Sequence, residues 1–323
     1  MGLSAATQLS ANGANLILVS RSQDKLEKAL QIVKVRPPSP PPPPSLQEAR
    51  ILTKPNPSQA AAKDPSKQRF HYISADVSKD SYAAPIVAEA TKWNNGNPPD
   101  IVWCAAGMSR PELFLDMEVA SMRSTMDINF FGTAEMAHAI LREWLAPDAP
   151  LNRQQPRHLI MTASVIVFFP LSGYASYSPS KAAMRALADT LSHEVQLYPQ
   201  NVKVHLVLPG TILSPGFDRE MTTKPEITKL LEEADPQQTP GEVARQAIAG
   251  LESGQYMVTV NWLGSLMRWG ALGGSLRNNW LVDTFMAAFI AIVVWPIVHF
   301  DMLGKTRGYG KKHGHPSTWK KQS

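Results

Sequence analysis

The sequence predicts an α/β protein with a doubly wound parallel sheet. Apolar runs of strand length alternate with helical segments along most of the 323 residues, and most runs end on polar, glycine or proline residues. Strands separated by helices imply parallel pairing, because a crossover connection returns the chain in the same direction. Hydrophobic residues make up 44% of the chain, which is enough for one large domain or two ordinary ones.

The first part of the chain predicts helix, strand and helix. Small residues predict a helix at 4–11, the apolar run 15–20 predicts a strand, and a helical pattern returns at 22–34. A proline run follows at 36–45. Because proline cannot donate a backbone hydrogen bond, we expect a polyproline II spacer there. With the polar residues around it, this run predicts a disordered insertion over 35–68.

Strands and helices then alternate as far as residue 260. The predicted strands are 70–75, 100–104, 158–164, 202–208 and 256–260. The predicted helices between them are 82–93, 121–145, 176–197 and 242–252. Doubly wound sheets bind ligands beyond the carboxyl ends of their strands. The residues at these ends are therefore site candidates: Arg21, Asp76, Cys104, Ser164 and Pro209.

Charge and cysteine content argue against several kinds of protein. The net charge is +5, but residues 303–323 carry six Lys or Arg and no acid, so the rest is close to neutral. A basic tail on a neutral domain argues against a nucleic-acid partner. The single cysteine, Cys104, excludes an internal disulfide and suits a protein that faces the cytosol. The eight histidines lack metal-site spacing, and the opening residues lack signal-peptide features, so we expect neither.

Ser164, Tyr177 and Lys181 form a constellation with a definite chemistry. Tyr177 and Lys181 are four residues apart and lie on one face of the predicted helix. A nearby ammonium and an oxidised nicotinamide are both expected to lower the pKa of the phenol from its usual value of about 10. Ser164 can donate a hydrogen bond to a carbonyl oxygen. We expect ketone reduction in which Tyr177 protonates the alkoxide; the alternative is a Tyr–Lys pair on a solvated helix face.

With these residues, the chain resembles the short-chain dehydrogenase/reductase family over residues 2–260. The resemblance implies a Rossmann-like fold and a nicotinamide cofactor. It implies that Ser164 binds the carbonyl group and that Tyr177 is the general acid. Lys181 would also hold the nicotinamide ribose, and Asn129 would support a water relay to that lysine.

The resemblance also assigns a cofactor site. Asp76-Val77 matches the segment beside the adenine, and Pro209-Gly210-Thr211 matches the loop over the nicotinamide. Arg21 stands where family members that prefer NAD carry an acid, so it favours a 2′-phosphate and hence NADPH. A strand-end turn at Asp76 and an ordinary surface arginine at Arg21 are the alternatives. The expected cofactor-binding residues are Gly2, Ser20, Arg21, Asp76, Val77, Ala106, Gly107, Tyr177, Lys181, Pro209, Gly210 and Thr211.

The sequence departs from the family pattern at two places. Cys104 replaces the asparagine of an Asn-x-Ala-Gly stretch, and a thiol cannot copy the hydrogen bonds of an amide. The family begins with a strand and a glycine-rich loop that cradles the pyrophosphate, and Gly2 matches the last of those glycines. We therefore expect the first strand and most of the loop to lie upstream of Met1. Without them we expect weak NADPH binding, and either a gap between the strands that end at Ser20 and Cys104 or another segment that fills it.

The segment after the predicted catalytic helix favours one substrate class. Ser214-Pro215-Gly216-Phe217 and Thr223-Lys224-Pro225-Glu226, followed by Thr239-Pro240, resemble the substrate loop of family members that reduce a sphingoid-base ketone. We therefore expect a sphingoid-base ketone substrate. One alternative is a membrane-associated reductase of another lipid, such as a steroid, retinoid or acyl-chain ketone. The other is a non-catalytic degenerate member, which the intact catalytic residues oppose.

The C-terminal region predicts membrane association. Residues 280–300 are strongly apolar, Pro296 lies among them, and basic residues follow. A spanning helix, a re-entrant hairpin and a buried element all fit this pattern. Lys320-Lys321 fits a signal that returns membrane proteins to the endoplasmic reticulum, with the catalytic domain facing the cytosol. We expect an NADP-binding domain at 1–270 and a membrane segment with a basic tail at 271–323; a homo-oligomer is also open.

Overall fold

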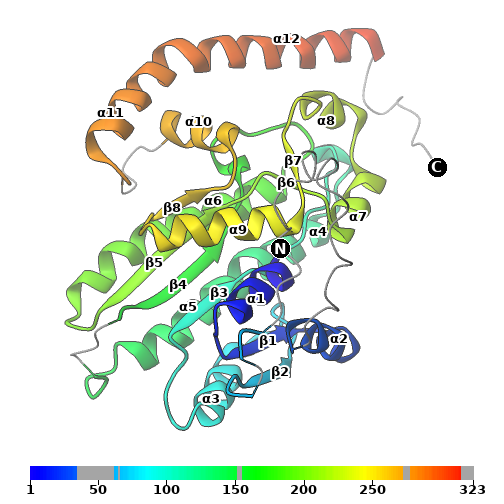
Figure 1. The fold of residues 1–323 in the computed structure, drawn as a ribbon. Helices are drawn as coiled ribbons and strands as arrows, with labels where there is room; N and C mark the ends of the chain where they lie inside the picture. The colour runs from blue at the N-terminus through cyan, green and yellow to red at the C-terminus, as the bar shows by residue number, and fades with distance from the viewer. Residues whose placement is uncertain (35–61, 65, 151–154, 272–276, 314–323) are drawn as a thin grey trace, which may run out of the picture.

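The computed structural model describes residues 1–34, 62–64, 66–150, 155–271 and 277–313 (Figure 1). Most of the predicted disordered insertion at 35–68 lies outside these residues. The dilysine pair Lys320-Lys321 also lies outside them.

A four-stranded parallel sheet with the order β3-β4-β5-β8 forms the centre of the molecule. Its strands are β3 (Ile101–Cys104), β4 (Arg157–Thr162), β5 (Val202–Leu208) and β8 (Met257–Thr259). Every pair in this sheet is parallel, with Leu159 opposite Val204 and Leu206 opposite Met257. The expected α/β fold class is confirmed, since each parallel pair encloses a helical crossover.

Alternating side chains divide the apolar core between the two faces of this sheet. On one face, Leu159 and Met161 of β4 pack in a large cluster with helices α3 (Ala83–Trp93), α5 (Gly132–Trp144) and α6 (Tyr177–Glu194). On the other face, Ile160 of β4 packs with Val243 and Ala247 of helix α9. Successive residues of a strand point to opposite faces, so one apolar run supplies both clusters.

Two short strands form a separate parallel sheet. These are β1 (Leu16–Ser20) and β2 (Phe70–Ser74). Within the described chain, β1 pairs only with β2 and β3 pairs only with β4. Val19 of β1 and Ile101 of β3 are both exposed. The gap that the sequence predicts between the strands ending at Ser20 and Cys104 is therefore present.

The helices around the sheets lie close to their predicted positions. They are α1 (Gly2–Ala11), α2 (Gln23–Lys34), α3 (Ala83–Trp93), α4 (Val119–Met126), α5 (Gly132–Trp144), α6 (Tyr177–Glu194) and α9 (Pro240–Glu252). One prediction was wrong in form, because the helix expected at 121–145 is interrupted by a π-helical turn at Asp127–Phe131. The turn contains Asn129, and such turns often occur at functional sites.

The segment between β5 and α9 contains structure that we did not predict. It holds β6 (Thr211–Ile212), α7 (Pro215–Thr223), α8 (Glu226–Leu231) and β7 (Gln237–Gln238). The side chain of Ser214 accepts from Phe217 N and caps α7. Thr239 and Glu242 form a capping box that starts α9. Ser and Thr at these positions supply acceptors for otherwise unsatisfied amides.

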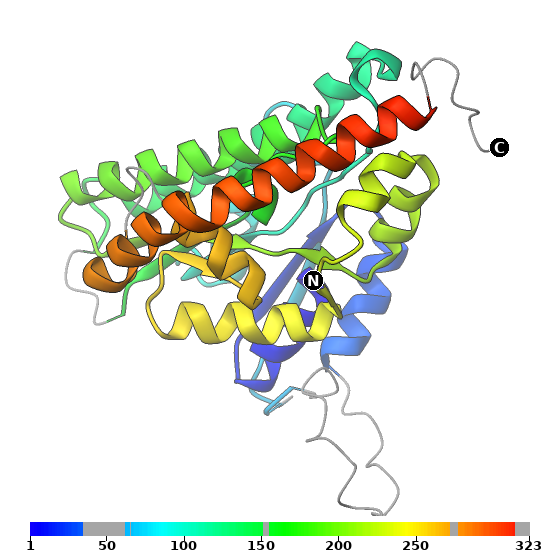
Figure 2. The ribbon, with the colours of Figure 1, turned by 90° about the horizontal axis from the view of Figure 1, so that it is seen from above.

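Three helical segments close the described chain. They are α10 (Trp262–Gly270), α11 (Trp280–Phe289) and α12 (Trp295–His313), and a π-helical turn at Ile290–Val294 joins the last two. α11 and α12 run as one long rod over α10, along one side of the molecule (Figures 1 and 2). Trp280–Met302 is long and apolar enough to cross a membrane, and only 11% of its most apolar window is buried.

Candidate active site

A pocket of about 770 Å³ opens at the carboxyl ends of the central strands. It is lined by Met1 and Gly2, by the segments that follow β3, β4 and β5, by the segment with α7 and α8, and by α10 and α12. The predicted site residues among its lining are Gly2, Gly107, Ser164, Tyr177, Lys181, Pro209, Gly210 and Thr211. Residues far apart in the sequence therefore meet where a parallel sheet is expected to bind its ligand.

Ser164 and Tyr177 face each other across the start of α6. Ser164 follows β4, and its Oγ accepts from Ile166 N at 3.3 Å, which caps a 3₁₀ turn. Tyr177 is the first residue of α6. Burial raises the pKa of the Tyr177 phenol above its usual value, and a hydrogen bond with Ser164 acts in the opposite direction. The phenol is therefore protonated at neutral pH.

Lys181 lies one helical turn after Tyr177, with its amine in the interior. Its Nζ donates to Thr162 O at 2.9 Å and lies 5.7 Å from the centre of the Tyr177 ring. Burial lowers the pKa of this amine to about 8. We expected this ammonium to lower the pKa of the Tyr177 phenol, and for the protein without a bound cofactor that expectation was wrong. Burial outweighs the effect of the ammonium, because the low dielectric disfavours the phenolate.

Asn129 lies behind the pocket and is fully buried in the π-helical turn. Its Nδ2 donates to Met108 O and to Ser180 Oγ, both at 2.9 Å, and its Oδ1 accepts from Met108 N at 2.8 Å. Ser180 in turn donates to Tyr177 O at 2.7 Å. These bonds join the π-helical turn, the segment after β3 and helix α6. Sequence reasoning missed Ser180, which Tyr-x-x-x-Lys spacing does not indicate.

Glycine is required at position 107 by close approach. An added Cβ would lie 3.3 Å from both Asn129 Oδ1 and Lys181 Nζ. Cys104, which replaces the asparagine of the family pattern, packs against the large core cluster. Burial raises the pKa of its thiol to about 12, so it is neutral and makes no charged contact with the site.

The other predicted cofactor residues lie outside the pocket, at the ends of β1, β2 and β3. Arg21 follows Ser20, and its carbonyl accepts from Ser74 Oγ at 3.2 Å. Asp76 accepts from Ser78 N and Ser78 Oγ, and these bonds lower the pKa of its carboxyl group. Val77 packs against Gly132 at the start of α5. Ala106 is exposed beside Gly107. This set spreads along one edge rather than meeting at a point.

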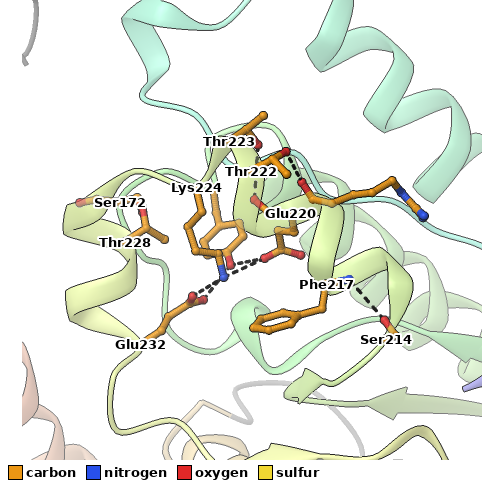
Figure 3. A network of polar contacts seen from close by, with 11 residues as sticks. Ser172, Ser214, Phe217, Glu220, Thr222, Thr223, Lys224, Thr228 and Glu232 are labelled. Atoms are coloured by element: carbon orange, nitrogen blue, oxygen red, sulfur yellow. Dashed lines mark hydrogen bonds and ion pairs between the residues drawn. The ribbon is translucent and has the colours of Figure 1, made fainter. Parts of the chain in front are cut away.

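A second polar network lies in the same pocket and was not predicted (Figure 3). Tyr174 Oη lies 2.6 Å from Glu220 Oε1 and 2.7 Å from Glu232 Oε1, and its single proton can be donated to either. Lys224 Nζ lies 3.1 Å from Glu220 and 2.6 Å from Glu232. The Tyr174 ring centre is 5.8 Å from that of Tyr177. The network therefore ties α7 and α8 to the start of α6.

Three acids and the cation Arg219 line this side of the pocket, and the cation Lys224 pairs with two of the acids. Glu220 and Glu232 share one cation, Lys224, and Asp235 also lines the pocket. Burial and the neighbouring Glu232 raise the pKa of the Asp235 carboxyl group to about 6. The sequence signalled only one part of this network, the Thr-Lys-Pro segment around Lys224. The two glutamates lie elsewhere in the chain, so no local pattern linked them to that lysine.

The residues present fit a nicotinamide cofactor. The Lys181 side chain is buried, yet among the described residues its amine bonds only to Thr162 O. An ammonium has three donors, so two remain for a ligand such as a ribose. Gly107 and Gly210 both line the pocket, and an added Cβ would lie 3.3 Å from Lys181 Nζ at the first and 3.1 Å from Asn261 Nδ2 at the second. Among the same described residues, no cluster of His, Cys, Asp and Glu could hold a metal.

The fold and pocket are those of a nucleotide-binding α/β protein. Residues 49–225, more than half of the chain, match the family described as short chain dehydrogenase. The chain belongs to this family.

Relatives and solved structures agree with this assignment. The 3-ketodihydrosphingosine reductase gsl-3 of Neurospora crassa is 50% identical over 100% of this chain and 83% of its own. The 3-ketodihydrosphingosine reductase ksrA of Aspergillus fumigatus is 40% identical over 99% and 84%. The fold is similar to a short-chain dehydrogenase from Sphingobium yanoikuyae in complex with NADPH, at 18% identity and a TM-score of 0.61 over 84% of this chain and 88% of that chain.

We expect Ser180→Ala to destabilise the protein by about 1–3 kcal/mol, because it removes a buried partner of the Asn129 amide. Chemical denaturation measures the effect. Ser178→Ala is the matched control, since Ser178 Oγ is buried in the same helix and makes no hydrogen bond among the described residues. Equal losses for the two variants would contradict the assigned network.

Proposed function

We propose that this protein reduces 3-ketosphinganine to sphinganine with NADPH, a step of sphingolipid biosynthesis. The observation that carries the proposal is the meeting of Ser164, Tyr177 and Lys181 in one large pocket of a short-chain dehydrogenase. Relatives that cover nearly the whole chain are named 3-ketodihydrosphingosine reductase, which supports this substrate. The assembled site also favours an enzyme over a degenerate member that only binds.

The catalytic roles follow from position and protonation. Ser164 Oγ donates a hydrogen bond to the ketone oxygen and holds it beside the phenol. Tyr177, protonated because burial raises its pKa, gives its proton to that oxygen as negative charge develops there. Lys181, as an ammonium close to the ring, stabilises the phenolate that remains. Asn129 is a positioning residue, because its amide holds the segment after β3 and helix α6 in place.

Bound NADPH supplies the hydride that reaches the ketone carbon. Lys181 would hold the nicotinamide ribose, and the Pro209–Thr211 loop would lie over the nicotinamide. Gly2, Ala106 and Gly107 would lie along the rest of the cofactor. At the far end, Asp76 and Val77 would contact the adenine, and Ser20 and Arg21 would take the 2′-phosphate.

The acidic side of the pocket supports a cationic substrate. A sphingoid-base ketone carries a protonated amine next to its carbonyl group, so the amine must lie close to Tyr177. Glu220, Glu232 and Asp235 line this part of the pocket, and Lys224 pairs with the two glutamates but not with Asp235. We therefore place the amine against Asp235. A steroid or retinoid ketone carries no such cation.

We further propose that the protein is bound to the endoplasmic reticulum membrane with its catalytic domain in the cytosol. The apolar stretch Trp280–Met302 and the basic residues after it support membrane association. The division into a domain at 1–270 and a membrane segment at 271–323 remains a proposal, as does a homo-oligomer.

The protein is expected to oxidise NADPH when 3-ketosphinganine is added. Absorbance of the reduced nicotinamide measures the rate. Turnover of a steroid ketone without turnover of the sphingoid ketone would move the assignment to another lipid reductase. Absence of turnover with both, despite NADPH binding, would favour the non-catalytic alternative.

Tyr177→Phe is expected to lower kcat by about 100-fold or more, because it removes the transferable proton. NADPH affinity, measured by fluorescence titration, should stay close to that of the wild type. Tyr198→Phe changes an exposed tyrosine and is the control. A Tyr177→Phe rate near that of the control would rule out the general-acid role.

The KM for 3-ketosphinganine is expected to fall as pH rises through about 6, because Asp235 becomes a carboxylate above its raised pKa. Asp235→Asn should remove this pH dependence and raise KM about tenfold, as a hydrogen bond to a charged group is worth about 1.5–3 kcal/mol. Glu233→Gln changes an exposed neighbouring acid and is the control. An unchanged pH profile in Asp235→Asn would remove Asp235 from substrate recognition.

A further inference from the structure

The helical rod formed by α11, the π-helical turn and α12 has two different faces. Its inner face lies on α10 and α8, and its outer face is uncovered (Figures 1 and 2). The sequence alone left open a spanning helix, a re-entrant hairpin and a buried element. The contacts that hold the inner face against the rest of the protein decide among these three arrangements.

A buried carboxylate anchors the start of the rod. Asp283 is 2% exposed, and its side chain accepts from Trp269 Nε1 at 2.9 Å and from Asn278 N at 2.7 Å. It also pairs with Arg268 of α10, which is itself buried, at 3.4 Å. An isolated carboxylate is costly in hydrocarbon. The rod therefore cannot leave α10 for the bilayer without breaking this pair.

The middle of the rod is held by close apolar packing. Ile290 is fully buried, and Trp295 Nε1 donates to Gly270 O at 3.0 Å. The Trp295 ring stacks on Phe169, with centres 5.3 Å apart. A Cβ added to Gly270 would clash with both Trp295 and Ile290. Glycine at the end of α10 thus allows the rod to lie directly on it.

Large apolar side chains of the rod are exposed to solvent. Leu281, Phe285, Ile292 and Ile297 are each between 67% and 86% exposed. The rod's acids are Asp283, which is buried, and Asp301, which pairs with Lys305 at 3.0 Å. The sequence places further cations after this face at Arg307, Lys311 and Lys312. An apolar face followed by cations is complementary to a bilayer surface with anionic headgroups.

The inner face also forms part of the catalytic pocket. Trp295, Val298 and Met302 line the same pocket as Ser164 and Tyr177. One helix therefore presents its outer side to solvent and its inner side to the site of chemistry.

We propose that the rod Trp280–His313 lies flat in the surface of an anionic membrane, and that the lipid ketone reaches the pocket from that membrane past Val298 and Met302. The outer face enters the lipid while the inner face stays docked on α10. The first part of this proposal is independent of the substrate, and the second rests on the proposed function.

Depth measurements test the orientation. Nitroxide labels are placed on cysteines introduced singly at Leu281, Phe285, Ile292 and Ile297, and the protein is bound to phosphatidylcholine vesicles containing phosphatidylserine. A flat rod gives four similar, shallow depths. A spanning helix gives depths that differ by as much as about 24 Å along the axis over these 16 residues, at about 1.5 Å per residue. Depths that follow residue number, or no contact with lipid, would overturn the proposal.

Two controls accompany the depth measurement. A label at Ile32→Cys, on exposed α2, should report water only. The unaltered chain gives the background from Cys104, which packs against the core.

Kinetics test the access route. Val298→Trp and Met302→Trp each place a larger side chain in the wall that α12 forms, and so narrow the pocket. Each should raise KM for long-chain 3-ketosphinganine in vesicles about tenfold more than it raises KM for a short-chain, water-soluble analogue. Ile32→Trp is the control. Equal effects on both substrates, or no effect on either, would overturn the route.

The two kinds of failure are distinguishable. If the wild type reduces no sphingoid ketone, the proposed function fails while the label depths still report the orientation. If it reduces the short analogue normally and the tryptophan variants treat both substrates alike, the function stands and the route past Val298 and Met302 is wrong.

Discussion

The hydrogen bond from Lys181 Nζ to Thr162 O joins the central sheet to the catalytic helix. Thr162 is the last residue of β4, so its carbonyl group lies where the strand ends. By accepting from a buried amine, it places Lys181 at the carboxyl end of the sheet, one turn from Tyr177. Ser164, two residues after Thr162, is positioned by the same strand. The geometry of the site therefore depends on where β4 ends.

The pocket is then closed by segments that depend on one another. Lys224 between two glutamates fastens α7 and α8, and Tyr174 carries this network to the start of α6. Charged groups of this kind are costly to bury unless they are paired, so each member requires the others. In the proposed function, the acid beside this network holds the amine of the ketone. Structural support and the proposed substrate recognition thus share one part of the pocket.

On the opposite wall, the rod over α10 combines two requirements that usually conflict. An apolar helix long enough to cross a bilayer would normally leave the domain, but Asp283 and Trp295 hold this one in place. Its outer face stays apolar while its inner face lines the pocket. In the proposed orientation one helix would separate the membrane from the catalytic pocket, which would suit a lipid substrate with low solubility in water.

The sequence by itself determined the α/β class, the strand at 202–208 to the residue, and the identities of Ser164, Tyr177, Lys181 and Asn129 as candidates. These signals are local, because apolar runs and residue spacing act within one element. It also predicted the gap between β1 and β3. Only the tertiary structure decided which residues meet. Ser180, Tyr174 and Glu232 become recognisable only when distant turns pack together, and burial reversed the expected direction of the Tyr177 pKa. The docking of Asp283 on Arg268 likewise depends on a contact between two helices, which no pattern within either helix contains.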